Sequence, residues 1–127
     1  MAGWGNSVTD DQRLVQFKLV YDYIKFHIGL YLATPTLLAI VAKALDVEAE
    51  AAFRYGFYGM IAIYALAGVH ATWFMSTYVN MPWQDDFLTV LEGGAFAPSR
   101  RIIHHALYWA GLVAGLAGLF AADLLKH

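Results

Sequence analysis

Three long stretches without Asp, Glu, Lys or Arg divide the sequence. They cover residues 26–42, 55–84 and 102–122. Because a bilayer core of about 30 Å needs about 20 apolar residues in a helix, each stretch can supply one membrane-spanning helix. The first is short, but Lys25 and Lys43 at its ends can lay their methylene stems along the helix and lift their ammonium groups to the lipid headgroups. We therefore expect three transmembrane helices, over residues 24–45, 52–78 and 102–125.

The segment before the first span has the pattern of an amphipathic helix. Thr9 precedes Asp10, Asp11 and Gln12, so Thr9 is a candidate N-cap and Gln12 can complete a capping box. Apolar residues then recur at helical spacing between charged ones, a pattern that suits a helix lying in the membrane interface. We expect this helix over residues 9–23.

The two connections between the spans differ in length and content. The first is short and charged, which predicts an antiparallel hairpin of the first two spans. The second, over residues 79–101, is longer and includes the apolar patch FLTVLE at residues 87–92. Apolar surface outside a span indicates contact with another protein, so we expect this loop to face a partner subunit.

Composition supports a single membrane domain over residues 1–127. The chain is 60% hydrophobic and 14% charged, with a mean hydropathy of +0.51, which is too apolar for an ordinary soluble domain and predicts contact with membrane lipid. The net charge of −2 gives no indication of nucleic-acid binding. The absence of cysteine excludes a disulfide, a thiolate metal site and a cysteine-held iron–sulfur cluster on this chain. The fold class that follows is an all-α integral membrane protein.

The distribution of basic residues predicts the orientation. The side with the N-terminus and the second loop carries five, namely Arg13, Lys18, Lys25, Arg100 and Arg101. The opposite side carries three, namely Lys43, Arg54 and Lys126. The positive-inside rule therefore favours the N-terminus on the inside of the cell's inner (cytoplasmic) membrane.

The histidines are the candidate functional residues. Three crossings would place four of them in one leaflet, and His127 elsewhere. Those four are His27, His70, His104 and His105. His104 shares a helix face with Tyr108 and with the glycines at 111, 115 and 118, a small-residue stripe suited to helix packing, so His104 should point inward. Ionisable residues inside a membrane are functional candidates because their burial costs free energy, whereas His27 and His105 could also be simple interfacial anchors.

Three kinds of chemistry could use these residues. Two imidazoles, with His70 and His104 as candidates, can ligate haem b, and Arg100 and Arg101 could neutralise its propionates. Alternatively, one histidine and one tryptophan can hold a quinone head. A mononuclear metal site is the third option, although no H-x-x-x-H pattern occurs. The candidate binding residues are His27, His70, Trp73, Arg100, Arg101, His104 and Tyr108.

The second span and the general layout resemble the membrane-anchor subunits of the fumarate reductase and succinate dehydrogenase group. The second span is rich in leucine and alanine and ends in a histidine followed closely by Trp-Phe, here His70, Trp73 and Phe74. The resemblance implies three spans, with the N-terminus and second loop against an iron–sulfur subunit. It also implies that His70 and Trp73 border a quinone pocket beside that subunit.

The sequence therefore predicts a small membrane subunit of a respiratory or redox complex. It would anchor other protein subunits and help to bind quinone, with haem b as a further candidate, for electron transfer. A chain of this kind is a non-catalytic subunit of an oxidoreductase rather than an enzyme by itself. The alternatives are a structural or accessory subunit of a larger membrane enzyme, and a pigment- or metal-binding membrane protein.

Overall fold

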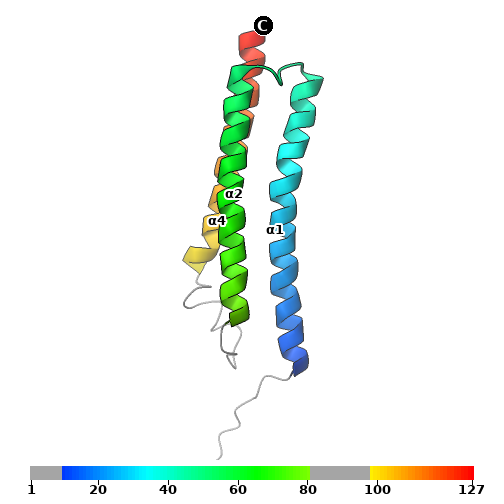
Figure 1. Ribbon diagram of the computed structural model, residues 1–127, viewed down its shortest axis with the longest axis vertical. Coiled ribbons are helices and arrows are strands. Elements are labelled where there is room, and N and C mark those ends of the chain that lie inside the picture. Colours follow the sequence, from blue (N-terminus) through cyan, green and yellow to red (C-terminus); the bar gives the residue numbers. More distant parts are fainter. Residues whose placement is uncertain (1–9, 81–97) are drawn as a thin grey trace, which may run out of the picture.

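The computed structural model describes residues 10–80 and 98–127, which form three long helices (Figure 1). They are α1 (Asp10–Ala44), α2 (Ala51–Asn80) and α4 (Pro98–Lys126). Each contains a segment long and apolar enough to cross a membrane, namely Phe17–Ala44, Ala51–Phe74 and Ile102–Lys126. The prediction of an all-α chain with three helices capable of spanning a membrane is thus confirmed. The start of α1, the end of α2 and the start of α4 lie at one end of the bundle.

α1 is one continuous helix, and a separate amphipathic helix over residues 9–23 is not seen. The residues from Asp10 to Tyr23 form the first turns of α1 instead. The physical reason is that no glycine or proline occurs between Asp10 and Ile28, so nothing interrupts the intrahelical hydrogen bonds where the predicted helix would end and the first span begin. The helix also continues through Pro35. The predicted cap at Thr9 and the patch at residues 87–92 lie outside the described residues.

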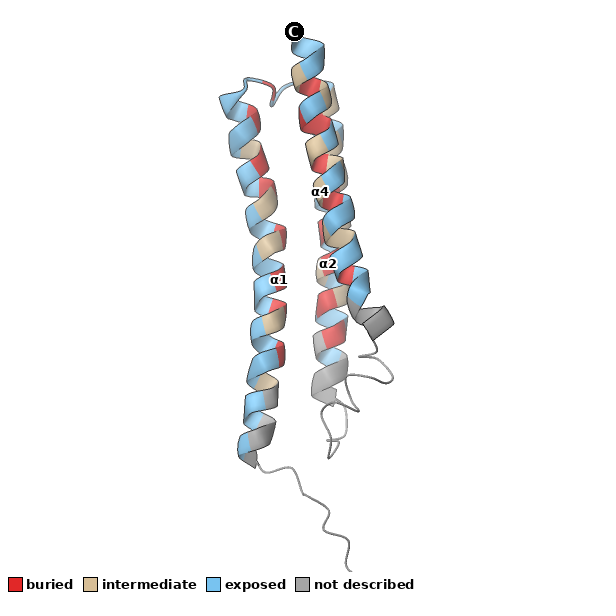
Figure 2. Ribbon diagram, turned by 180° about the vertical axis from the view of Figure 1, so that it is seen from behind, coloured by how far each residue is buried: buried red, intermediate tan, exposed pale blue. Residues whose placement is uncertain are grey.

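Each helix buries a narrow stripe of residues against the other two (Figure 2). Along each helix most of the buried residues follow one another at spacings of three or four residues, or of seven where one position of the pattern is not buried. This spacing is typical of left-handed helix bundles. On α1 the buried residues include Val20, Ile24, His27, Tyr31, Leu38 and Ala42. On α2 they include Phe53, Met60, Tyr64, Ala67, Ala71 and Phe74. On α4 they include His104, Gly111, Gly115, Gly118 and Ala122. Two histidines therefore occupy core positions.

The glycines of α4 bring that helix very close to α2. A Cβ atom added to Gly118 would lie 2.8 Å from Cα of Gly56 and 2.9 Å from the carbonyl oxygen of Ala52. A Cβ on Gly111 would meet the Tyr64 ring at 2.4 Å. The predicted packing role of the glycine stripe is confirmed, and it explains why His104, on the same face, points into the bundle.

The outer surface of the bundle is apolar. Large hydrophobic side chains are exposed along all three helices, among them Leu32, Leu37, Ile40, Val69, Val113 and Phe120. A water-soluble monomer rarely exposes this much contiguous apolar surface, whereas lipid tails cover it without cost. The exterior therefore fits a multi-pass membrane protein in contact with lipid.

The turn between α1 and α2 is fastened to the end of α4. Asp46 has a positive φ of 56°, and the amide N–H groups of Asp46 and Val47 donate to the carbonyls of Lys43 and Ala42 in a Schellman motif. Lys126 Nζ donates to the carbonyl oxygens of Leu45 at 3.1 Å and Asp46 at 2.8 Å, and pairs with the Asp46 carboxylate at 2.9 Å. This contact holds the end of α4 against the turn between α1 and α2, at the end of the bundle opposite to the histidines.

Candidate functional site

Four histidines from three helices meet at one end of the bundle. His27 comes from α1, His70 from α2, and His104 and His105 from α4. The ring centroid of His104 lies 5.1 Å from that of His27 and 5.4 Å from that of His70. His27 and His104 are buried, and His105 is exposed. The expectation that three spans gather these four histidines at one end is therefore confirmed, and we call them the histidine cluster.

Tyr23 connects α1 to both histidines of α4. Its hydroxyl oxygen lies 2.7 Å from Nε2 of His104 and 2.9 Å from Nε2 of His105. A hydroxyl group has one proton, so it can donate to only one of two neutral imidazoles and must accept an N–H from the other. The two neighbouring histidines therefore hold opposite roles toward Tyr23 when both are neutral.

His27 is held by the backbone of its own helix. Its Nδ1 lies 2.7 Å from the carbonyl oxygen of Tyr23, one turn earlier, and only a protonated Nδ1 can donate to that oxygen. The neutral imidazole consequently has a free lone pair on Nε2. This spacing of four residues also puts Tyr23 and His27 on the same face of α1, toward α4.

His70 joins the cluster from α2. Its Nδ1 lies 3.4 Å from Nδ1 of His104, and its ring centroid lies 5.8 Å from that of Trp73. His70 is half-buried and Trp73 is about half exposed, at 48%. The predicted pair His70 and Trp73 thus forms the α2 side of the cluster.

A layer of tyrosines separates the histidine cluster from the rest of the core. The Tyr64 and Tyr108 rings stack with centroids 5.5 Å apart, and Tyr31 lies against both. Tyr31 donates a long hydrogen bond of 3.5 Å to the carbonyl oxygen of His104, and Tyr108 bonds Thr34 at 3.2 Å. Tyr108, a predicted site residue, therefore belongs to this layer and not to the histidine cluster.

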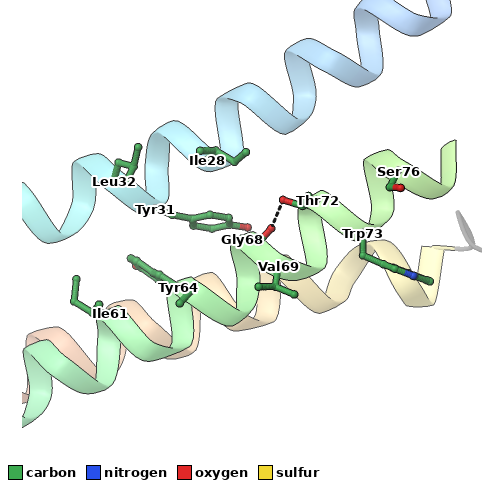
Figure 3. A pocket seen from close by; sticks show the side chains of 11 residues that line it. Ile28, Tyr31, Leu32, Ile61, Tyr64, Gly68, Val69, Thr72, Trp73 and Ser76 are labelled. Atoms are coloured by element: carbon green, nitrogen blue, oxygen red, sulfur yellow. Dashed lines mark hydrogen bonds between the residues drawn. The ribbon is translucent and has the colours of Figure 1, made fainter. Parts of the chain in front are cut away.

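An apolar cleft of about 770 Å³ lies between α1 and α2 (Figure 3). Its walls come from Ile28, Tyr31, Leu32, Ile61, Tyr64, Ala65, Gly68, Val69, Thr72, Trp73 and Ser76. Trp73, Thr72 and Ser76 lie together toward one end, and Leu32 and Ile61 lie toward the other. The cleft thus has a polar end beside the histidine cluster, because Trp73 contacts His70 and Tyr31 contacts His104.

The predicted haem ligands His70 and His104 face each other through their Nδ1 atoms, which lie 3.4 Å apart as hydrogen-bond partners. Their role as axial ligands of a haem stays a prediction from sequence. The side chains of Arg100 and Arg101, expected to neutralise propionates, lie outside the described part of the chain.

Two contributors to the site were not in the predicted list of binding residues. Tyr23 and His105 both bond within the cluster, whereas the sequence offered His105 as a candidate histidine that could also be an interfacial anchor and did not single out Tyr23. The spacing of four between Tyr23 and His27 was the available indication. The contact between Tyr23 and His105 depends on the packing of α1 on α4, because the two residues are 82 positions apart in sequence.

Comparison with protein-family models, with curated protein sequences and with solved structures gave no match. The resemblance to the fumarate reductase and succinate dehydrogenase anchors therefore stays a prediction from sequence.

Proposed function

We propose that this chain is a small multi-pass subunit of a redox complex that binds a quinone between α1 and α2. The observation that carries the proposal is that one apolar cleft shares two of its residues, Tyr31 and Trp73, with contacts to the histidine cluster. A quinone has an apolar ring and tail but takes up two protons with two electrons, so it needs this combination of surfaces.

The polar end of the cleft suits the quinone head. The indole N–H of Trp73 can donate to one carbonyl oxygen of the quinone. Thr72, the preceding residue of α2, donates its hydroxyl proton to the carbonyl oxygen of Gly68 at 2.8 Å, so it adds polarity to this end of the cleft but no donor. His70 lies behind Trp73 and is bonded to His104, so a proton given to the quinone by His70 can be replaced through the cluster. The tail would follow the apolar wall toward Leu32 and Ile61.

Electrons would come from a partner subunit at the same end of the bundle. Leu14 and Val15 are 70% and 59% exposed, and they precede the start of the apolar segment at Phe17. Apolar side chains beyond the lipid-facing segment favour contact with protein. We place this partner on the inside of the cytoplasmic membrane, because more basic residues flank that end of the spans.

A glycine on the cleft wall allows a sharp test. Gly68 lines the cleft, and a Cβ atom there would meet nothing within 4 Å, so Gly68→Leu fills the cleft without disturbing the helices. Gly59→Leu is the matched control on α2, since its Cβ also meets nothing within 4 Å and Gly59 is not part of the cleft wall. We expect Gly68→Leu to weaken binding of a short-chain quinone by about tenfold or more, a loss of about 1.4 kcal/mol, with Gly59→Leu unchanged.

The second candidate, a structural or accessory subunit, predicts a different outcome. Such a chain would bind no quinone, and both leucine variants would behave alike in calorimetric titration. A visible absorption spectrum of the purified protein completes the comparison. A reduced-minus-oxidised haem band would identify haem as a bound cofactor, and a chlorophyll-like band would indicate a pigment-binding protein.

A further inference from the structure

We propose that His27, His104 and His105 form a binding site for one divalent transition-metal ion, with Zn²⁺ as the reference metal. One ligand atom from each of the three histidines lies within 4.8 Å of the other two. The three imidazoles come from α1 and α4, which lie far apart in sequence and are brought together by the fold. This site is separate from the quinone cleft, whose walls contain none of the three histidines.

Two of the three imidazoles already have the outer contacts that metal-ligating histidines need. Such residues usually engage their second ring nitrogen with a carbonyl or another acceptor, which fixes the tautomer and the ring orientation. His27 uses Nδ1 to bond the carbonyl of Tyr23, and His104 places Nδ1 against His70. Nε2 of His27 is then left for the ion, and Nε2 of His104 would exchange its bond to the Tyr23 hydroxyl for a bond to the ion.

The Tyr23 hydroxyl marks where an ion would be held. It lies 2.7 Å from Nε2 of His104 and 2.9 Å from Nε2 of His105, so both nitrogens point at one spot. Around a tetrahedral Zn²⁺ with bonds of about 2.0–2.1 Å, neighbouring ligand atoms lie about 3.4 Å apart. The ligand atoms lie within 4.8 Å of one another, so a separation at that limit must shorten by about 1.4 Å to reach this spacing. The exposed His105 side chain is the ligand with the most room to adjust. Tyr23 or a water then takes the fourth position.

The donor set selects the class of ion. Three imidazole nitrogens suit zinc, copper, nickel and iron, whereas magnesium and calcium require oxygen ligands. No carboxylate belongs to this group of three. His105 is exposed near Ile102, where the apolar segment of α4 begins, so an ion can reach the site from the water boundary.

The test is a titration of purified protein in mild detergent, prepared with an affinity tag that contains no histidine. Co²⁺ serves as the probe, because its tetrahedral imidazole complexes absorb in the visible range, and Zn²⁺ competition gives the affinity. We expect one Co²⁺ per chain. His105→Ala removes an exposed ligand with little risk to folding, and we expect it to weaken binding about 100-fold or more. His127→Ala, on an exposed histidine at the opposite end, should change nothing.

A second readout covers variants that alter stability. Zn²⁺ should raise the melting temperature of the wild type and of His127→Ala but not of His27→Ala or His105→Ala, because only the first two bind it in the folded state. Equal Co²⁺ affinity in wild type and in His105→Ala, or no stoichiometric binding by the wild type, would overturn the proposal. The experiment contains no quinone, so its outcome bears on the metal site alone.

Discussion

The Tyr23 hydroxyl lies 2.7 Å from Nε2 of His104, although the two residues are 81 positions apart in sequence. His104 is fully buried, so this bond satisfies a nitrogen that water does not reach. The contact also joins the start of α1 to the start of α4. It is the polar contact on which the geometry of the histidine cluster depends most directly.

Tyr23→Phe should therefore destabilise the protein. The variant keeps the ring but leaves the Nε2 atoms of His104 and His105 without the hydroxyl, and an unsatisfied buried polar group costs about 1–3 kcal/mol. Tyr21→Phe is the control, because Tyr21 is 54% exposed. Denaturant unfolding followed by circular dichroism in detergent measures both. Equal unfolding midpoints for the two variants would show that the Tyr23 bond contributes nothing to stability.

Gly118→Ala should separate α2 from α4. Its Cβ would meet backbone atoms of Gly56 and Ala52 at 2.8 and 2.9 Å, which side-chain rotation cannot relieve, and overpacking of this kind costs about 1–3 kcal/mol.

Gly59→Ala is the matched control for that substitution. The Cβ there meets nothing within 4 Å, and alanine favours the helix over glycine by up to about 1 kcal/mol. In thermal unfolding, the melting temperature of Gly118→Ala should therefore lie below that of the wild type, and that of Gly59→Ala above it. A Gly118→Ala protein as stable as Gly59→Ala would mean that the two helices are farther apart than described.

His70→Ala should weaken quinone binding while the protein still inserts in the membrane. The change removes the partner of His104 Nδ1 and the ring beside Trp73, so the polar end of the cleft loses its proton source. Titration with a short-chain quinone measures the loss, and His127→Ala serves as the control. Unchanged affinity and unchanged quinone turnover in the assembled complex would remove His70 from the site.

The contact between Lys126 and Asp46 should make stability depend on pH. The hydrogen bond from Lys126, together with its charge, lowers the pKa of the Asp46 carboxyl in the folded protein. A lowered folded pKa gives stability that is present above the unfolded value of about 3.9 and is lost as the pH falls through the folded value. Lys126→Met should lower the melting temperature at pH 7. The difference in melting temperature between Lys126→Met and the wild type should shrink at acidic pH. A difference that does not change with pH would mean that the stabilisation comes from the two contacts of Lys126 with backbone carbonyls instead.

Three crossings place the two ends of the chain on opposite sides of the membrane. The sequence has no cysteine, so Asp11→Cys and His127→Cys each introduce a single reporter thiol on an exposed position. In intact cells, a membrane-impermeant maleimide should label the cysteine at 127 and spare the one at 11, as the positive-inside rule favours. Labelling of both would contradict three crossings, and labelling of only position 11 would reverse the orientation.

The sequence was sufficient for the helices but only partly for the site. Charge-free runs and helix length determine that three helices can span a membrane, and the glycine stripe determined that His104 points inward. The expected separate helix over residues 9–23 was not seen, because a pattern of charges does not by itself interrupt a helical segment that lacks glycine and proline. The roles of Tyr23 and His105 could not be read from sequence, since they arise only where α1 packs on α4.

α1 is joined to α4 by two polar contacts far apart along its length, through Tyr23 in its first half and through Asp46, just beyond its last residue. The cleft opens between these two fastenings, where α1 meets α2 through apolar side chains. Under the proposed function, a guest molecule would reach the cleft sideways from the lipid, between these two contacts. Lateral exchange of this kind would suit a hydrophobic guest that never passes through water.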